Sequence, residues 1–384
     1  MPGRRGQQHR RRRRRTAPAG ILTGNSAAGR GVEPAYLNPG DDMAQLELGL
    51  DTFGDVTFGD DGTPLPYDQV IRNIVDQAVL ADELGLAFFG VGEHHRDDFA
   101  VTAPEVVLAA IAARTTNIHL GTAVTVLSSD DPIRVYERFA TLDALSHGRA
   151  EVILGRGSFT ESFPLFGFDL GQYEELFSEK LDLFAALREE GPITWSGNLR
   201  PPLEGQEVFP KTAAGSLTTW IGVGGSPESV IRAARYGIPL MLAIIGGPPA
   251  QFKPYADLYR QALEQLGKPQ LPIGVHSPGH VADTDEQALD ELWPHYEVQR
   301  TRIGRERGWP PASRTEFEAS AGPEGALYVG SPQTVADKIV RNTKILGMDR
   351  FDLKFSNGTL GHDKLMRSIE LYGREVVPLV RAAL

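Results

Sequence analysis

The stretch HLGTAVTVLSSDDPIRVYERFATLDALSHGRAEVILGRG spans residues 119–157 and decides the fold. It begins and ends with β-rich apolar runs, residues 119–126 and 150–157, and the run between them is amphipathic. Proline is favoured at the first position of a helix, so we expect a helix from Pro132 to Leu145. A strand, a helix and a strand in this order are typical of a βαβ unit in a parallel sheet.

The same alternation recurs on both sides of this unit. Further strands are expected at residues 46–50, 88–93, 218–225, 240–245, 272–282 and 350–355. Further helices are expected at Tyr67–Leu84, Ala103–Arg114, Tyr173–Arg188, Pro227–Tyr236, Pro249–Leu266, Asp285–Arg305 and Asp363–Val380. Eight strands, each followed by a helix, predict an α/β fold, a (β/α)8 TIM barrel with long insertions, over residues 43–384. The insertions are residues 190–217 and 306–330, which we expect to act as lids or partner surfaces.

Residues 1–42 differ in composition from the rest of the chain. They carry nine arginines and three acidic residues, a net charge of +6, and almost no large apolar side chains. Such a segment buries too little surface to offset the entropy of ordering, so we expect a disordered Arg-rich extension. It lacks the apolar region of a twin-arginine signal. We interpret it as an upstream extension of the reading frame before Met43, and a tail for an anionic surface is the alternative.

Charge and cysteine content exclude several function classes for the predicted barrel. The whole chain carries a net charge of −11, so the residues after 42 carry −17, which argues against a nucleic-acid partner. The chain has no cysteine, which excludes disulfides, thiolate metal sites and cysteine nucleophiles. No apolar run approaches the roughly 18 residues that cross a membrane, so no membrane partner is expected. These features fit a cytoplasmic enzyme.

The C-terminal ends of barrel strands are where an active site is expected. The second expected strand ends in Glu93, His94 and His95. Neighbouring residues on an extended strand point to opposite faces, and no HExxH spacing is present, so a metal site is not expected. We predict that one histidine faces a ligand, with a structural or surface role as the alternative.

The fourth and fifth expected strands end in glycine-rich turns. Gly155, Arg156 and Gly157 place a guanidinium group between two flexible positions, which suits a phosphate, although an ion pair with an acidic neighbour is the alternative. After the fifth strand, Ser226 lies at an expected helix N-cap with Pro227 at the first helical position. A helix N-terminus can bind an anion, and this turn, which lacks the dinucleotide fingerprint, suits a mononucleotide phosphate.

Four segments resemble the bacterial luciferase-like flavin-dependent monooxygenases in order and spacing. They are GVGEHHRDDF (90–99), GTAVTVLSSDDPIRVYERFATLDALSHGRAEVILGRGSFTESFPLFG (121–167), WIGVGGSPESVIRAARYGIPL (220–240) and YVGSPQTVADKIVRNTKILGMDRFDL (328–353). The resemblance implies a base, His94, beside the flavin, and a flavin phosphate held by Arg156 and the α-helical cap at Ser226 and Ser229. It also implies a non-proline cis peptide at Ala123–Val124 beneath the flavin ring. The implied cofactor-binding residues are Ala123, Val124, Gly155, Arg156, Gly157, Ser158, Phe159, Gly224, Gly225, Ser226 and Ser229.

The resemblance further implies a reaction and its partners. Reduced FMN from a separate flavin reductase, together with O2, would oxidise a small organic substrate, and the protein would be a homodimer. Two alternatives stay open: an oxidoreductase that depends on the deazaflavin F420, and a flavin-binding barrel without activity. Gly155, Phe159 and Gly225 stand where bacterial luciferases carry Cys, Tyr and an acidic residue, so light emission is not expected. Five aromatic side chains are expected to line an apolar pocket or to belong to the core: Phe53, Phe58, Phe99, Phe159 and Phe163.

Overall fold

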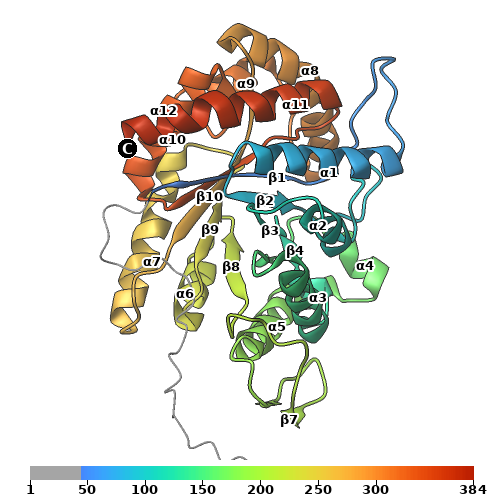
Figure 1. Cartoon of the computed structure of the whole chain (residues 1–384), viewed down its shortest axis with the longest axis vertical. Helices are drawn as coiled ribbons and strands as arrows, with labels where there is room; N and C mark the ends of the chain where they lie inside the picture. The colour runs from blue at the N-terminus through green and yellow to red at the C-terminus, as the bar shows by residue number, and fades with distance from the viewer. Residues whose placement is uncertain (1–44) are drawn as a thin grey trace, which may run out of the picture. The chain divides into compact units, whose positions relative to one another are not determined.

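The computed structural model describes residues 45–384, and the predicted Arg-rich extension, residues 1–42, lies outside them. In this part of the chain, nine strands form one parallel sheet in the order β3-β2-β1-β12-β10-β9-β8-β5-β4 (Figure 1). Their bounds are β1 (Glu47–Thr52), β2 (Phe88–Val91), β3 (His119–Thr122), β4 (Thr125–Val126), β5 (Glu151–Gly155), β8 (Thr218–Val223), β9 (Leu240–Ala243), β10 (Ile273–Val281) and β12 (Arg350–Lys354).

The two ends of this sheet meet and close it into a barrel. β3 and β4 stand at opposite ends of the strand order, yet only Ala123 and Val124 separate them in sequence. Leu120 of β3 also forms a parallel bridge to Ala150, directly before β5. β3 and β4 are therefore one interrupted strand, which gives eight strand positions around the barrel. The predicted (β/α)8 barrel is confirmed.

Helices cover the outer face of the sheet, as Figure 1 shows. The helices that follow the strands are α1 (Tyr67–Glu83), α2 (Pro104–Ala112), α3 (Pro132–Ser146), α5 (Tyr173–Leu187), α6 (Pro227–Tyr236), α7 (Lys253–Gln265), α8 (Asp285–Arg307), α11 (His362–Leu371) and α12 (Val377–Ala383). Each buries one apolar face, as α1 does with Val70, Ile74 and Ala78 at helical spacing. All five residues of β5 are buried, as expected for a parallel strand covered on both faces. No helix within residues 45–384 is both long and apolar enough to span a bilayer.

The chain after β10 differs from the sequence prediction. Residues 306–330 were expected to be irregular, but they contain α9 (Arg314–Ala321) and β11 (Tyr328–Gly330), which pairs with β10. A helix that was not predicted, α10 (Pro332–Leu346), then leads to β12. The other insertion, residues 190–217, contains an antiparallel hairpin of β6 (Ile193–Trp195) and β7 (Leu203–Gln206).

Buried charges close the N-terminal end of the barrel. The Arg350 guanidinium donates to Glu151 at 2.7 Å and to Asp352 at 2.9 Å, and all three side chains are at least nine-tenths buried. The Trp220 indole donates to Glu151 at 3.0 Å, and the Arg350 guanidinium carbon lies 3.5 Å from the centroid of the Phe88 ring. This end of the barrel is filled by side chains, which leaves the opposite end for a ligand.

Candidate functional site

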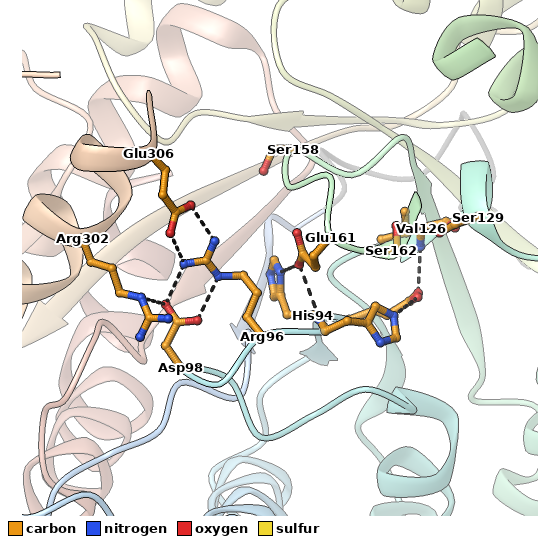
Figure 2. A network of polar contacts seen from close by, with 12 residues as sticks. His94, Arg96, Asp98, Val126, Ser129, Ser158, Glu161, Ser162, Arg302 and Glu306 are labelled. Carbon is orange, nitrogen blue, oxygen red and sulfur yellow. Dashed lines mark hydrogen bonds and ion pairs between the residues drawn. The ribbon is translucent and has the colours of Figure 1, made fainter. Parts of the chain in front are cut away.

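His94 lies in the loop after β2 and is enclosed by aromatic rings. Its ring stacks on Phe99 at a centroid distance of 4.2 Å, and Phe53 and Phe159 lie 5.1 and 5.0 Å away. Its Nδ1 is 3.6 Å from Oε1 of Glu161, which comes from the loop after β5. Figure 2 shows the two side chains facing each other. Glu161 therefore limits the orientations that the imidazole can take.

His95 contacts different residues and ties the loop to the sheet. Its Nε2 is 3.1 Å from Oε1 of Glu93, whose Oε2 accepts the Val126 backbone N–H at 2.9 Å. The ring also meets Phe166 edge-on at 4.9 Å. His95 thus has a structural environment, while His94 has a single carboxylate neighbour and rings around it. No group of three or more metal-ligating side chains occurs in residues 45–384.

The peptide bond between Ala123 and Val124 is cis, at the interruption between β3 and β4. The Val124 side chain packs onto the end of β5, because a Cβ built on Gly155 would lie 2.4 Å from Val124 Cγ2. Val124 therefore leaves no room for a side chain at position 155. A cysteine at position 155, like any residue with a Cβ, would overlap Val124.

Most of the predicted site residues after β2, β3 and β5 come together around one small cavity. It has a volume of about 60 Å³, and His94, Ala123, Val124, Gly157, Ser158 and Phe159 line it together with Glu93, His95, Val126, Glu161 and Ser162. Gly157 has a φ of 76°, a conformation that favours glycine. The strand ends that the sequence singled out therefore lie side by side.

The remaining predicted residues form a second group at the N-terminus of α6. Ser226 is the N-cap, its Oγ accepting the Ser229 N–H at 3.4 Å, with Pro227 at the first helical position as predicted. Arg156 forms an ion pair with Glu174, an acidic neighbour of the kind that the alternative interpretation of this arginine expects. The Glu174 carboxylate is 59% exposed and also lies 3.9 Å from the guanidinium of Arg232.

Arg232 was not singled out in the sequence. It lies one turn into α6, its side chain is only 19% exposed, and its Nη1 is buried without a hydrogen-bond partner. Gly224, before the helix, has open space where a Cβ would be, and Gly225 has a φ of 118°. Two guanidinium groups, the positive end of the α6 dipole and open space beside the backbone make this an arrangement that favours an anion.

A larger cavity of about 470 Å³ opens between the barrel mouth and the α8–α9 insertion, by which we mean α8, α9 and the residues between them, 285–321. Phe53, Phe99 and Phe159 line it, as predicted. Phe58 and Phe163 do not: Phe58 forms a bridge with Pro64, and the buried Phe163 stacks on Tyr173. The wall that the sequence did not reveal comes from the insertion and includes Tyr296, Arg300, Ile303, Arg307, Trp309 and Phe317.

Ion pairs fasten this insertion to the loop that carries His94. Arg96 pairs with Asp98 at 2.9 Å and with Glu306 of α8 at 2.7 Å, and Arg302 of α8 pairs with Asp98 at 3.3 Å (Figure 2). Arg302 also pairs with Asp97. The hydrogen bond from Arg96 lowers the pKa of Glu306 below its ordinary value. These side chains therefore connect α8, which lines the large cavity, to the loop that carries His94 at the small cavity.

The floor of the barrel mouth carries two more buried pairs. His276 Nδ1 is 2.6 Å from Asp51 Oδ2, and the His276 ring stacks on Phe53 at 5.6 Å. Lys354 Nζ is 3.1 Å from Asp55 Oδ2. These groups were missed in the sequence because each lies inside a strand or its adjoining turn, with a partner about 225 to 300 residues away.

Comparison with known proteins agrees with the resemblance noted in the sequence. A family model described as luciferase-like monooxygenase matches residues 52–350. The chain is 27% identical over 337 residues to 4-hydroxyprotoasukamycin monooxygenase of Streptomyces nodosus subsp. asukaensis, covering 81% of this chain and 87% of that one.

Two solved structures share the fold. The oxygenating constituent of 3,6-diketocamphane monooxygenase from Pseudomonas putida, in complex with FMN, has a TM-score of 0.70 at 18% identity, covering 87% of this chain and 98% of that one. An F420-dependent secondary alcohol dehydrogenase has a TM-score of 0.66 at 17% identity, covering 88% and 99%. At these identities the likeness concerns the fold alone.

Proposed function

Because the chain belongs to the luciferase-like monooxygenase family, we propose that it uses reduced FMN and O2 to oxidise a small organic substrate. The observation that carries the choice of FMN is the anion-binding group at the N-terminus of α6. Arg156 and Arg232 lie beside the N-terminal end of α6, whose dipole favours an anion, and there is open space beside the Gly224 backbone. A terminal phosphate monoester is the anion that such a group would accept.

The position of Glu174 supports this proposal. Its exposed carboxylate lies between Arg156 and Arg232, where it partly neutralises both. An exposed ion pair of this kind is worth only about 0–1 kcal/mol, so a phosphate with more charge and more acceptor oxygens can displace it. The buried Nη1 of Arg232, which lacks a partner, would gain one from the phosphate. The residues present therefore fit the group.

Different side chains at the barrel mouth would then transfer the proton, orient the imidazole and exclude water. Reduced flavin, when bound, supplies the electrons that activate O2. His94 is placed to take up or donate a proton at its imidazole, and Glu161 holds the ring through Nδ1. The rings of Phe53, Phe99 and Phe159 exclude water from the space around it.

Cofactor titration of the purified chain tests the proposal. Anaerobic titration with reduced FMN and with F420 is expected to show tighter binding of FMN. Arg232→Gln should weaken FMN binding by about ten-fold, since it removes a charged hydrogen-bond donor from the phosphate. Arg235→Gln on the exposed side of the same helix removes the same charge away from the site and should leave the affinity unchanged. Tighter binding of F420, or equal effects of both variants, would contradict the proposal.

The reductase and the dimer remain predictions. A separate flavin reductase should be needed to supply reduced FMN, and product should form from O2 only when both proteins are present. If the chain consumes oxygen with reduced flavin but converts no substrate of a screen to product, it would instead be a flavin-binding barrel without a monooxygenase reaction. The predicted homodimer can be checked by light scattering of the full chain.

A further inference from the structure

The large cavity lies next to the proposed flavin site and is walled largely by rings. Its volume of about 470 Å³ is within the range of small-molecule sites. Phe53, Phe99 and Phe159 line the side near His94, and Tyr296, Trp309 and Phe317 line the side formed by α8 and α9. Flat aromatic walls on both sides favour a planar, conjugated ligand over a flexible aliphatic chain.

Two arginines of the cavity wall have no carboxylate partner. Arg300 lies over the Trp309 ring at 4.2 Å, and Arg307 lies over the same ring at 5.2 Å and over Phe159 at 5.1 Å. Within residues 45–384 neither forms an ion pair, although Arg302 on the same helix pairs with Asp97. Nη1 of Arg300 is buried without any hydrogen-bond partner, and Arg307 donates only to the Ser158 carbonyl.

The unpaired Nη1 of Arg300 costs about 1–3 kcal/mol unless a ligand supplies an acceptor, whereas Arg307 is exposed at the edge of the cavity. A guanidinium group is planar and matches a carboxylate with two parallel hydrogen bonds. The stack on Trp309 holds both arginines in place before a ligand arrives, which lowers the entropy lost on binding.

The net charge of the whole cavity lining also favours an anionic ligand. The lining has three basic side chains, Arg300, Arg307 and Lys354, and one acidic side chain, Glu316. Lys354 is already paired with Asp55, so the two arginines outweigh Glu316. A net positive cavity is unusual in a body whose residues after 42 carry −17, and it selects for negative ligands.

We propose that the substrate is a planar aromatic anion, a fused-ring carboxylate or phenolate, bound in this cavity. Its acidic group would meet Arg300 and Arg307, and its ring system would extend between the phenylalanines toward His94. The proposal rests on the proposed function only in taking this cavity as the substrate cavity, because the binding of the anion itself needs no flavin.

A matched pair of probes tests it, 2-naphthoate and its neutral amide 2-naphthamide, titrated into the full chain by calorimetry. Naphthoate should bind at least about ten-fold more tightly than naphthamide. Arg300→Gln and Arg307→Gln should each weaken naphthoate binding by about ten-fold and leave naphthamide within about two-fold. Arg305→Gln is the control, since Arg305 lies on the same helix and carries the same charge but does not line the cavity.

Three outcomes would overturn the proposal: equal binding of the two probes, no binding of naphthoate at millimolar concentration, or an effect of Arg305→Gln as large as that of Arg300→Gln. Flavin titration separates this result from the proposed function. Arg232→Gln should weaken reduced FMN and leave naphthoate unchanged, and Arg300→Gln should do the opposite. Loss of the naphthoate preference with intact FMN binding would reject the substrate class alone.

Discussion

The two ends of the barrel treat buried arginines differently. At the N-terminal end, Arg350 contacts two carboxylates and an aromatic ring, and only its Nη2 lacks a hydrogen-bond partner. At the mouth, Arg232 and Arg300 each have a buried nitrogen without a partner and no carboxylate closer than 3.9 Å. Charges at the closed end are neutralised within the chain, and charges at the mouth have room for a ligand. The closed end should therefore govern stability, and the mouth should govern function.

Replacement of His94 should give the largest effect and leave stability intact. His94→Ala is expected to lower turnover about 100- to 10,000-fold, the range for loss of a general acid or base. Product formation would be measured with a substrate found in the screen and a flavin reductase. Flavin affinity and melting temperature should match those of wild type, and the exposed His147→Asn serves as the control. Full turnover in His94→Ala would remove the proposed base.

Replacement of Arg350 should break the closed end. Arg350→Met leaves Glu151 and Asp352 buried without their cation, so the free energy of unfolding should fall by about 3–5 kcal/mol. Urea denaturation at neutral pH measures this. Arg341→Met removes an exposed pair with Glu324 and should cost less than about 1 kcal/mol. Equal losses in the two variants would mean that the buried cluster contributes no more than a surface pair.

The same cluster makes the free energy of unfolding depend on pH in the acidic range. Burial alone would raise the pKa of Glu151, but Arg350 and His119 outweigh it and lower the pKa to about 2. The folded-state pKa is thus below the ordinary value of 4.5, so this stabilisation is present above pH 4.5 and is lost as the pH falls toward 2. In Arg350→Met the loss of stability below pH 4.5 should be correspondingly smaller.

Gly155 lies at the mouth end of β5, and its replacement should give the smallest effect. Gly155→Ala forces a Cβ against Val124, which should cost about 1–3 kcal/mol of unfolding free energy. Val124→Ala in the same chain should recover most of this, which a double-mutant cycle by thermal unfolding would measure. Gly191→Ala, where a Cβ meets open space, is the control. Additive effects of the two substitutions would show that the contact does not constrain position 155.

The barrel could be predicted from the sequence because its signals are local. Each strand is a short apolar run followed by an amphipathic helix, and caps such as Ser226–Pro227 mark where helices begin. The α8–α9 insertion was harder, because α9 has only one large apolar residue, Phe317, and β11 has three residues. Ser313 and Glu316 do form a capping-box pattern that could have indicated α9.

The candidate site was predictable only where it lies at strand ends. His94, Arg156 and Ser226 follow strands directly, so the fold alone brings them to the barrel mouth. The arginines of α8 could not be sorted from the sequence, because what distinguishes Arg302 from Arg300 is an ion pair to Asp97, 205 residues earlier. Pairing across such separations appears only in the folded chain.

The large cavity takes most of its wall from one uninterrupted stretch of chain, between Tyr296 and Leu327. The residues proposed to bind the phosphate come from the loop after β5 and from α6, far from that stretch in sequence. The segment that lines the proposed substrate cavity can therefore be changed without touching the residues proposed to bind the flavin phosphate. For the same reason, grafting residues 296–327 between relatives is a direct route to new substrate preferences.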